Sequence, residues 1–471
     1  MDLDITNEEF FRAFELIKGS KESIFLTGKA GTGKTTFLKY LRQNCSKTMM
    51  VVAPTGVAAI NAGGVTIHSL FQIKPSVYLP NDKRLRTNVP VGDSDDTTIY
   101  SYFKFGQKKR KILEALELLV IDEVSMVKCD LLDVVDKLLR VFGGGNPNMP
   151  FGGKQVLLIG DPFQLPPVAG DGDWEILNKC YDTRFFFGAK SFQEASFTSI
   201  ELKKVYRQTE HEFIELLNKV RVAELTAADQ NALDCLIAPR GFEFNKEGYV
   251  YLGTHKVTVE HINEQELLRI QSPLCKFEGL ISGDFPDRDL PADKTIYLKV
   301  GAQVMFVKND LSADKAYYNG KLGIIHSIHE DKIEVLAEGG KVILLKKATW
   351  EKIRYQWNEE KQAIEETIEG SFEQYPIRLA WAITVHKSQG LTLGKVFADL
   401  AGSFEPGQVY VALSRCTTLG GLKLKSSIPI HRIRAAPEVL NFAKKLCGYA
   451  PCAATMSGDI DPAADGSIRP S

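Results

Sequence analysis

Residues 28–35 read GKAGTGKT, a glycine-rich run that ends in a lysine and a threonine. A short apolar segment before it, Ile24–Thr27, predicts a strand, and the pattern from Lys34 to Asn44 predicts a helix. A strand, this spacing and a helix in succession are typical of a loop whose backbone N–H groups surround phosphate oxygens. The chain is therefore expected to contain a parallel α/β sheet with a phosphate-binding loop at the carboxyl end of one strand.

The residue types in this loop suit contact with a nucleotide. Gly28, Gly31 and Gly33 allow the backbone to turn its N–H groups toward phosphates. Lys34 is expected to reach the β- and γ-phosphates, and Thr35 to offer its hydroxyl to Mg²⁺. A chance glycine-rich turn would need neither the strand before it nor the helix after it. The predicted nucleotide-binding residues of the loop are Gly28, Ala30, Gly31, Thr32, Gly33, Lys34, Thr35 and Thr36.

Two adjacent carboxylates end a second apolar run. Leu118–Ile121 predicts a strand, and Asp122 and Glu123 follow it directly, at the sheet edge where ligands bind in such folds. We expect Asp122 to hold Mg²⁺ together with Thr35, and Glu123 to polarise the attacking water. On their own the two carboxylates would also fit a solvated corner, and a phosphotransferase would share the phosphate loop. The glutamate directly after the metal-binding aspartate favours hydrolysis.

A third string, GDPFQLPPV at residues 160–168, follows the predicted strand Val156–Ile159. Gly160 permits a sharp turn at the end of that strand. Gln164 is placed to carry its amide to the γ-phosphate or to the attacking water, and the two following prolines stiffen the chain as it leaves. A proline-rich loop without function would not explain the position of the string, one strand after the Asp-Glu pair.

The composition excludes several other classes of protein. The 471 residues carry a formal net charge of −1, so any nucleic-acid binding must depend on basic residues gathered locally. No run of about 18 apolar residues is present, and Met1–Phe14 lacks the layout of a secretory signal. We therefore expect a cytoplasmic protein without a membrane span. The eight cysteines contain no Cys-x-x-Cys pair, which indicates reduced thiols and not a metal site.

The order of the predicted elements indicates more than one domain. Met49–Ala53 and Tyr249–Gly253 are further short apolar strands, whereas residues 73–106 are polar and contain prolines, which predicts a small insertion or a mobile loop. Closely spaced strands with a turn at Gly339-Gly340 then predict a small antiparallel β-barrel, after which the α/β pattern returns. The barrel strands are Val300–Val307, Gly323–Ile328, Lys332–Leu336 and Lys341–Leu345, and the later strands are Arg378–Val385 and Lys395–Leu400.

Seven strings occur in the order seen in superfamily-1 helicases: GKAGTGKTT, VVAPTGVAA, VIDEVSM, GDPFQLPPV, VYRQ, TVHKSQGLT and VYVALSRC. TIHSLF, PFGG, NGKLGII and HKSQG resemble the Pif-type (petite integration frequency) DNA helicases of superfamily 1B, which are RecD-like. The resemblance covers the chain up to about Arg434. One departure is the segment Thr6-Asn7-Glu8-Glu9-Phe10, which lacks the glutamine that family members often have there, and this puts glutamine-mediated adenine recognition in question.

The resemblance implies an α/β fold class with two RecA-like P-loop domains, each built on a parallel sheet. It also implies a small insertion in the first domain and a small antiparallel β-barrel inserted in the second. The implied boundaries are 1–65 and 107–187 for the first RecA-like domain, 66–106 for the small insertion or wedge region, 188–297 and 376–446 for the second RecA-like domain, 298–375 for the Src-homology-3-like barrel, and 447–471 for a disordered tail.

The resemblance further implies that ATP lies in the cleft between the two RecA-like domains. Arg207 in VYRQ and Arg415 in ALSRC match the family arginines that reach the γ-phosphate from the second domain, and Gly390 allows the backbone to approach the nucleotide. Without the resemblance, each arginine would fit a surface or salt-bridging role equally well. The implied catalytic residues are Lys34, Asp122, Glu123, Gln164, Arg207 and Arg415.

A track for single-stranded DNA across both domains is also implied. Its hydroxyls, backbone N–H groups and lysine suit phosphate oxygens, and His68 suits stacking on a base of any sequence. His68 would equally fit a structural histidine. The implied DNA-binding residues are Pro54, Thr55, Gly56, Thr66, His68, Thr384, His386 and Lys387. A second patch, which contains Trp350, Tyr355 and Trp357 among Lys346, Lys347, Lys352 and Arg354, would fit either DNA contact or a barrel core with a solvated face.

The implied activity is that of an ATP-dependent DNA helicase, a DNA-stimulated ATP hydrolase that moves 5′ to 3′ on single-stranded DNA. It would use ATP and Mg²⁺, unwind tailed duplexes and G-quadruplexes, and act as a monomer in DNA repair, recombination and telomere maintenance. One alternative is a nucleotide-dependent switch that binds a protein partner, which would not need both arginines. Another is a RecD-like subunit whose nuclease lies on a partner chain, since no nuclease-like carboxylate cluster is visible in the sequence.

Overall fold

The computed structural model describes residue 4 and residues 6–167, 171–310, 316–330, 332–337 and 339–446. The predicted tail at 447–471 lies outside the described residues. The described strands form two parallel and three antiparallel sheets, which confirms the predicted mixed α/β fold class. Among the described residues, no helix is both long enough and apolar enough to cross a bilayer.

The first parallel sheet has the strand order β3-β2-β4-β5-β1-β6. Its central strands are buried along their whole length, as expected for short apolar strands covered on both faces. The strands predicted around residues 24, 49, 118 and 156 all belong to it. Its bounds are β1 (Ser23–Gly28), β2 (Met49–Ala53), β3 (Val65–Thr66), β4 (Leu118–Ile121), β5 (Gln155–Ile159) and β6 (Phe197–Leu202).

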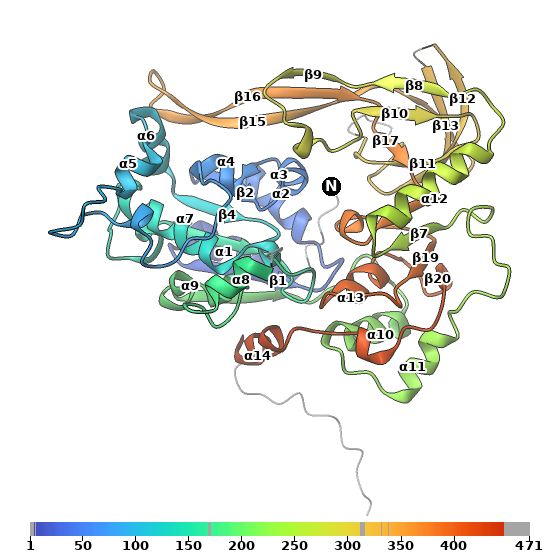
Figure 1. Cartoon of the computed structure of the whole chain (residues 1–471), viewed down its shortest axis with the longest axis horizontal. Coiled ribbons are helices and arrows are strands. Elements are labelled where there is room, and N and C mark those ends of the chain that lie inside the picture. Colours follow the sequence, from blue (N-terminus) through green and yellow to red (C-terminus); the bar gives the residue numbers. More distant parts are fainter. Residues whose placement is uncertain are drawn as a thin grey trace, which may run out of the picture.

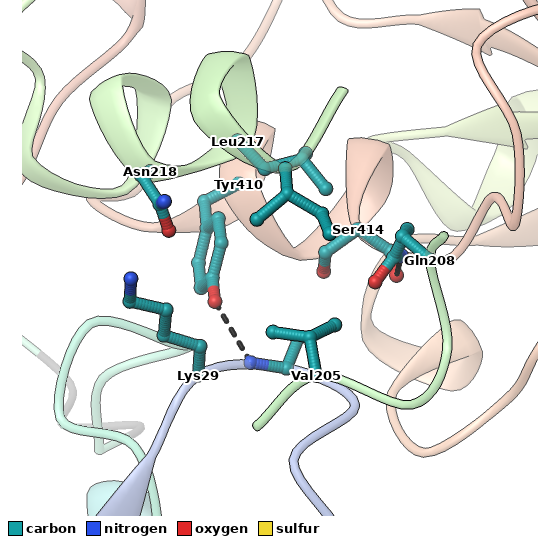
Figure 2. Close-up of a pocket in the computed structure, with 9 residues that line it drawn as sticks. Lys29, Val205, Gln208, Leu217, Asn218, Tyr410 and Ser414 are labelled. Carbon is teal, nitrogen blue, oxygen red and sulfur yellow. Dashed lines mark hydrogen bonds between the residues drawn. The ribbon is translucent and has the colours of Figure 1, made fainter. Parts of the chain in front are cut away.

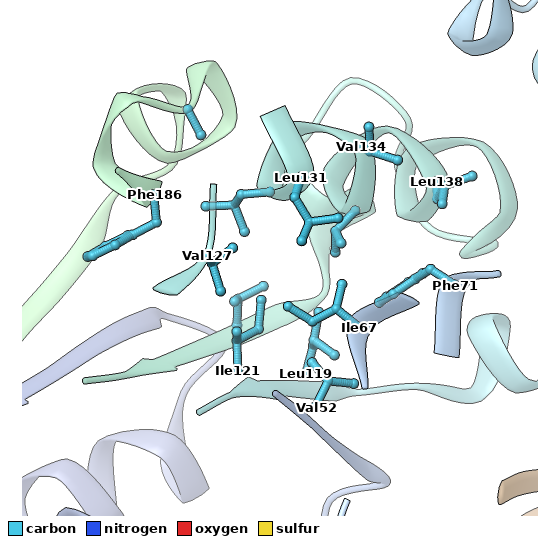
Figure 3. Packing of buried hydrophobic residues seen from close by; sticks show 14 of the residues in the cluster. Val52, Ile67, Phe71, Leu119, Ile121, Val127, Leu131, Val134, Leu138 and Phe186 are labelled. Carbon is cyan, nitrogen blue, oxygen red and sulfur yellow. The ribbon is translucent and has the colours of Figure 1, made fainter. Parts of the chain in front are cut away.

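Helices cover this sheet on both faces and complete the first unit (Figure 1). On one face α1 and α2 bury Phe14 and Phe37. On the other, α7 buries Leu131 and Leu138 above Ile121 (Figure 3). The helices of this unit are α1 (Glu8–Gly19), α2 (Lys34–Asn44), α3 (Gly56–Ala62), α4 (Ile67–Phe71), α5 (Ile99–Phe103), α6 (Gln107–Ala115), α7 (Cys129–Phe142), α8 (Asp171–Leu177) and α9 (Lys190–Glu194).

Residues 66–106 pack onto this first unit. Phe71, Tyr78 and Phe103 are buried in the same core as α7, and the carboxylate of Asp130 accepts a hydrogen bond of 3.1 Å from the backbone of Tyr78. The polar composition suggested either an insertion or a mobile loop. The structure shows a packed region because a few apolar side chains, widely spaced in the sequence, all enter one core.

The second parallel sheet has the order β18-β7-β19-β20 and forms the second unit with its helices. Its core contains Leu252, Val396 and Val411, all fully buried. The strands are β7 (Val250–Gly253), β18 (Ala382–Thr384), β19 (Val396–Asp399) and β20 (Leu422–Leu424), and the helices are α10 (His211–Val222), α11 (Ala227–Asp234), α12 (Lys256–Arg269) and α13 (Gln408–Leu413).

The antiparallel part is a five-stranded sheet of order β14-β13-β12-β11-β17, with a three-stranded sheet β15-β16-β9 and a pair β10-β8. β13 and β14 pair across the predicted turn at Gly339-Gly340. The strands are β8 (Cys275–Glu278), β9 (Leu280–Gly283), β10 (Thr295–Leu298), β11 (Gln303–Phe306), β12 (Leu322–His329), β13 (Lys332–Ala337), β14 (Val342–Leu345), β15 (Ala348–Asn358), β16 (Ala363–Gln374) and β17 (Ile377–Leu379).

The long hairpin β15–β16 leaves the five-stranded sheet and reaches across to the first unit (Figure 1). The hydroxyl of Tyr355 accepts a hydrogen bond of 3.1 Å from the backbone N–H of Val51, and Lys111 pairs with Glu359 at 2.7 Å. Trp350 is buried in a separate apolar cluster. The rings of Trp350 and Tyr355 are therefore buried within the protein, whereas Lys346, Lys347 and Arg354 of the same patch are exposed.

Two segments lie with the first unit although the predicted boundaries assigned them to the second. β6 pairs in parallel with β1, so the first sheet continues past residue 188. Near the end of the described chain, α14 (Pro437–Leu446) returns to the first unit, where the Phe442 ring stacks on Phe187 with centroids 4.2 Å apart. Both differences have the same cause: apolar side chains find partners that are distant in the sequence.

Candidate functional site

The glycine-rich loop connects β1 to α2, and its glycines give it a defined backbone conformation. Gly31 and Gly33 have φ values of +81° and +90°, in the left-handed region that favours glycine. A Cβ on Gly31 would also lie 2.6 Å from the Cβ of Arg207, so a side chain would collide there. The Lys34 ammonium donates to the carbonyls of Gly28 at 2.6 Å and Lys29 at 3.0 Å. The loop is thus preformed, with a cation at its centre.

Two carboxylates lie near this cation at the carboxyl end of β4. The backbone N–H of Glu123 donates to the Asp122 carboxylate at 2.9 Å. Burial and the charge of Glu123 raise the pKa of Asp122 to about 7, and burial also raises the pKa of Glu123. Burial lowers the pKa of Lys34, against the charges of Asp161 and Glu123. Charges buried this way are typical of sites that act on a ligand.

The donor set fits magnesium held jointly with a nucleotide. Mg²⁺ is usually bound by one or two carboxylates together with substrate phosphates. Asp122 supplies a half-buried carboxylate, and Thr35 supplies a hydroxyl on an exposed residue next to Lys34. Over the described ranges, no cluster of three or more His, Cys, Asp or Glu forms a complete protein cage. The residues therefore suit a cation that the phosphates help to bind.

Gln389 bonds both to the Asp122-Glu123 pair and to the GDPFQLPPV string, and it was not predicted as a site residue. Its amide donates to Glu123 Oε2 at 3.0 Å and to Gln164 Oε1 at 3.4 Å. It directly precedes Gly390, whose φ of +80° lies in the left-handed region. The HKSQG string contained this glutamine, but only the tertiary fold shows that it meets Glu123 and Gln164.

Two arginines lie near the loop and its carboxylates: the charge of Arg207 acts on Lys34, and that of Arg415 acts on Glu123. Arg207 donates to Thr392 Oγ1 and to the Ser414 carbonyl, both at 3.1 Å. Arg415, only 2% exposed, donates to the Val411 carbonyl and to Ser414 Oγ, both at 2.8 Å. Burial lowers the pKa of Arg207 to about 10 and that of Arg415 to about 9. Their hydrogen bonds go to hydroxyl and carbonyl oxygens, and the charges of Glu123 and Asp161 also act on Arg415.

A hydrogen-bond chain that the sequence did not predict joins the two units beside the loop. The backbone N–H of Ala30 donates to the Tyr410 hydroxyl at 2.9 Å (Figure 2), and this hydroxyl donates to Asp161 at 3.3 Å. Arg221 of α10 pairs with the same carboxylate at 2.8 Å. Burial would raise the pKa of Asp161, but the charges of Arg221 and Lys34 outweigh it and the pKa is lowered. Asp161 lies in GDPFQ and Tyr410 in VYVALSRC.

The residues expected to contact DNA follow the carboxyl ends of strands in both sheets. Thr55 and Thr66 also cap α3 and α4, accepting from Ala58 N at 3.2 Å and Ser69 N at 3.1 Å. Pro54, Thr55 and Gly56 follow β2, whereas Thr384, His386 and Lys387 end or follow β18.

In the second unit these residues also have partners within the protein. Thr384 Oγ1 accepts from Lys387 N at 3.2 Å, and His386 contacts Glu405 at 3.3 Å.

The segment that departs from the family pattern lies beside the loop. Asn7 caps α1 and donates to the Tyr206 hydroxyl at 3.0 Å, while Phe10 is buried against Phe37. The Tyr206 ring lies 3.7 Å from the position of a Cβ on Gly33 and is half-exposed. An aromatic face, with no glutamine, therefore borders the loop on this side.

The fold and the loop define a P-loop nucleotide-binding protein built on two parallel sheets. Residues 5–231 match the family model described as PIF1-like helicase. The "ATP-dependent DNA helicase Pif1" of Bdellovibrio bacteriovorus is 30% identical over 446 residues, which cover 93% of this chain and 91% of that protein. The chain belongs to the PIF1-like helicase family.

Solved structures of Bacteroides Pif1 are similar to this chain over nearly its full length. The unliganded protein is 39% identical, covers 94% of this chain and 98% of its own, and gives a TM-score of 0.83. The form bound to single-stranded DNA, also 39% identical, covers 94% of this chain and 97% of its own, and gives a TM-score of 0.63. A complex of that protein with ADP-AlF4 gives 0.84, so the present conformation is more similar to these two forms than to the one bound to single-stranded DNA.

Proposed function

We propose that this chain, a Pif1-type ATP-dependent DNA helicase, hydrolyses ATP between its two parallel-sheet units and uses the cycle to move along single-stranded DNA. The observation that carries the proposal is that Arg207 lies against Gly31 of the loop and Arg415 acts on Glu123, while both guanidinium groups bond to hydroxyl and carbonyl oxygens. Two guanidinium groups this close to the loop favour an added anion, since the burial of cationic charge is costly unless it is compensated. A triphosphate supplies that anion and makes contact with both units at once.

Each of these residues has a proposed role in ATP hydrolysis. Lys34 would hold the β- and γ-phosphates, and Thr35 and Asp122 would hold Mg²⁺, which would supply neutralisation of phosphate charge. Glu123 polarises the attacking water, and Gln389 keeps that carboxylate beside Gln164. In this arrangement Arg207 and Arg415 stabilise the charge that develops as the phosphoryl group leaves.

The chain of hydrogen bonds through Tyr410 is proposed to link nucleotide state to the position of the units. Tyr410 and Arg415 lie on or directly after α13, whereas Ala30 and Asp161 belong to the first unit. A shift of the loop on binding or release of phosphate therefore acts on α13 through Tyr410 and Asp161. This gives a physical route from hydrolysis to relative motion of the two units.

We further propose the division into domains and a DNA track that crosses them. The first RecA-like domain would comprise the β3-to-β6 sheet with α14, and the second the β18-to-β20 sheet, with 66–106 and the antiparallel part as insertions. Backbone N–H groups, hydroxyls and a lysine at two sheet edges support sequence-independent phosphate contact. The proposed DNA-binding residues are Pro54, Thr55, Gly56, Thr66, His68, Thr384, His386 and Lys387.

The family resemblance supports translocation from 5′ to 3′, as a monomer, with G-quadruplex unfolding and roles in repair, recombination and telomere maintenance. Strand displacement on duplexes that carry a single tail, either 5′ or 3′, tests the direction. With ATP and Mg²⁺, we expect the purified chain to displace strands from duplexes with a 5′ tail and not from those with a 3′ tail. Displacement that depends on a 3′ tail would remove the assigned direction while leaving helicase activity intact.

A further inference from the structure

A short acidic segment, residues 284–293, links β9 to β10 and crosses from the antiparallel part toward the first unit. It reads DFPDRDLPAD, with four aspartates and one arginine. Its apolar residues fix its position: Phe285 and Ala292 are buried with Trp350, and Leu290 packs on the same cluster as Ile60 of α3. The Arg378 guanidinium also donates to the Pro291 carbonyl at 2.9 Å. The segment is therefore held in a defined place.

The segment lies against residues of the proposed DNA track in the first unit. A Cβ built on Gly56 would lie 2.8 Å from the carboxylate carbon of Asp289 and 2.9 Å from its Cβ. The Asp289 carboxylate thus lies against the backbone of the Pro54-Thr55-Gly56 string. Backbone and hydroxyl groups of this string are the ones that suit a DNA phosphate.

The far end of the same segment meets the track in the second unit. Burial and the charge of Arg378 lower the pKa of Lys387, and the charge of the exposed Asp293 acts in the opposite direction. The charges of Asp293 and Arg378 thus both act on Lys387, and Arg378 holds this end of the segment through its bond to the Pro291 carbonyl. The other charged groups that face Lys387 are Lys256 and Glu260 of α12. One run of ten residues consequently places a carboxylate near track residues of each unit.

We propose that the acidic segment covers the DNA track in the DNA-free protein, with Asp289 against the backbone that binds a phosphate once DNA enters. DNA binding then has to displace the segment. This inference rests on the proposed DNA track. It adds that the acidic segment and DNA compete for the same residues, so DNA binds less tightly than it would to an uncovered track.

Removing one carboxylate should raise the affinity for DNA, a result that damage to the fold would not produce. Asp289→Asn should bind a fluorescein-labelled oligothymidylate about fivefold more tightly at low salt, because a negative charge no longer opposes the phosphates. The advantage should shrink as salt is added. Asp287→Asn removes the same charge two residues away, from a side chain that is exposed and lies 3.4 Å from Lys294, and should change the affinity less than about twofold.

Lys387→Ala separates failure of the cover from failure of the track. It should weaken binding and reduce the salt slope by about 0.7. If Lys387→Ala weakens binding and Asp289→Asn leaves it unchanged, the cover is wrong and the track stands. If both aspartate variants tighten binding equally, only general charge is involved and the cover is again wrong. If Lys387→Ala has no effect, the proposed track itself fails.

Hydrogen exchange on the whole chain gives a second, independent readout. Backbone amides of residues 284–293 should lose protection when oligothymidylate binds, whereas those of α11 should not change. Protection that stays constant or rises in the acidic segment would overturn the displacement step.

Discussion

Arg415→Ala is expected to lower the turnover number for ATP by about 10³–10⁵, the range that a phosphate-stabilising arginine contributes. The affinity for ATP should fall much less, because the proposed contact strengthens as charge develops on the departing phosphoryl group. Steady-state hydrolysis gives the turnover number, and binding of a fluorescent ATP analogue gives the affinity. Equal losses in turnover and affinity would contradict the role assigned to Arg415.

Two further variants separate the chemical role of Arg415 from a general disturbance of the second unit. Arg415→Lys keeps the positive charge but loses the planar fork, so turnover should stay well below that of the wild type. Arg432 is another arginine of the second unit, and it donates to the Ser403 carbonyl at 3.3 Å. Arg432→Ala should change turnover less than about twofold. If it costs as much as Arg415→Ala, the effect arises from general disturbance of the second unit.

Lys34→Ala is expected to reduce ATP hydrolysis by about 10³-fold or more, since it removes a preorganised cation from the site where phosphate charge develops. Binding of single-stranded DNA without nucleotide should be almost unchanged, because Lys34 bonds the carbonyls of Gly28 and Lys29 and no proposed track residue. Hydrolysis and oligothymidylate binding, measured on the same preparation, check both halves of the prediction.

Lys29 provides the matched control for Lys34. It carries the same charge in the same loop, but it lines a small cavity of about 10 Å³ with Tyr410 and Asn218 between the two units (Figure 2). Lys29→Ala should therefore lose far less activity than Lys34→Ala. Comparable losses would mean that the loop needs charge in general and that Lys34 has no special place at the phosphates.

The local architecture around the phosphate loop was predictable from short runs of sequence. β2 and β4 have the predicted bounds, and α2 runs from Lys34 to Asn44 as expected. Each is an apolar run or helical pattern ended by glycine or polar residues, so neighbouring residues determine it. The parallel sheet followed from the alternation of such strands with helices.

The features that depend on distant partners were not predictable in this way. The β15–β16 hairpin has an alternating pattern that suits any antiparallel sheet, and only the tertiary fold brings Tyr355 to Val51. The acidic segment reads as an exposed loop until Asp289 is found against Gly56. Likewise, nothing in the spacing of Tyr410 and Asp161 shows that they share a hydrogen bond.

The rate of ATP hydrolysis with and without single-stranded DNA tests most directly whether nucleotide chemistry between the units is coupled to a DNA track across them. With saturating ATP and Mg²⁺, the account predicts that oligothymidylate accelerates hydrolysis by the wild-type chain and that the acceleration is lost in Arg415→Ala. Hydrolysis at the same rate in the presence and absence of DNA would contradict the coupling and favour a nucleotide-dependent switch.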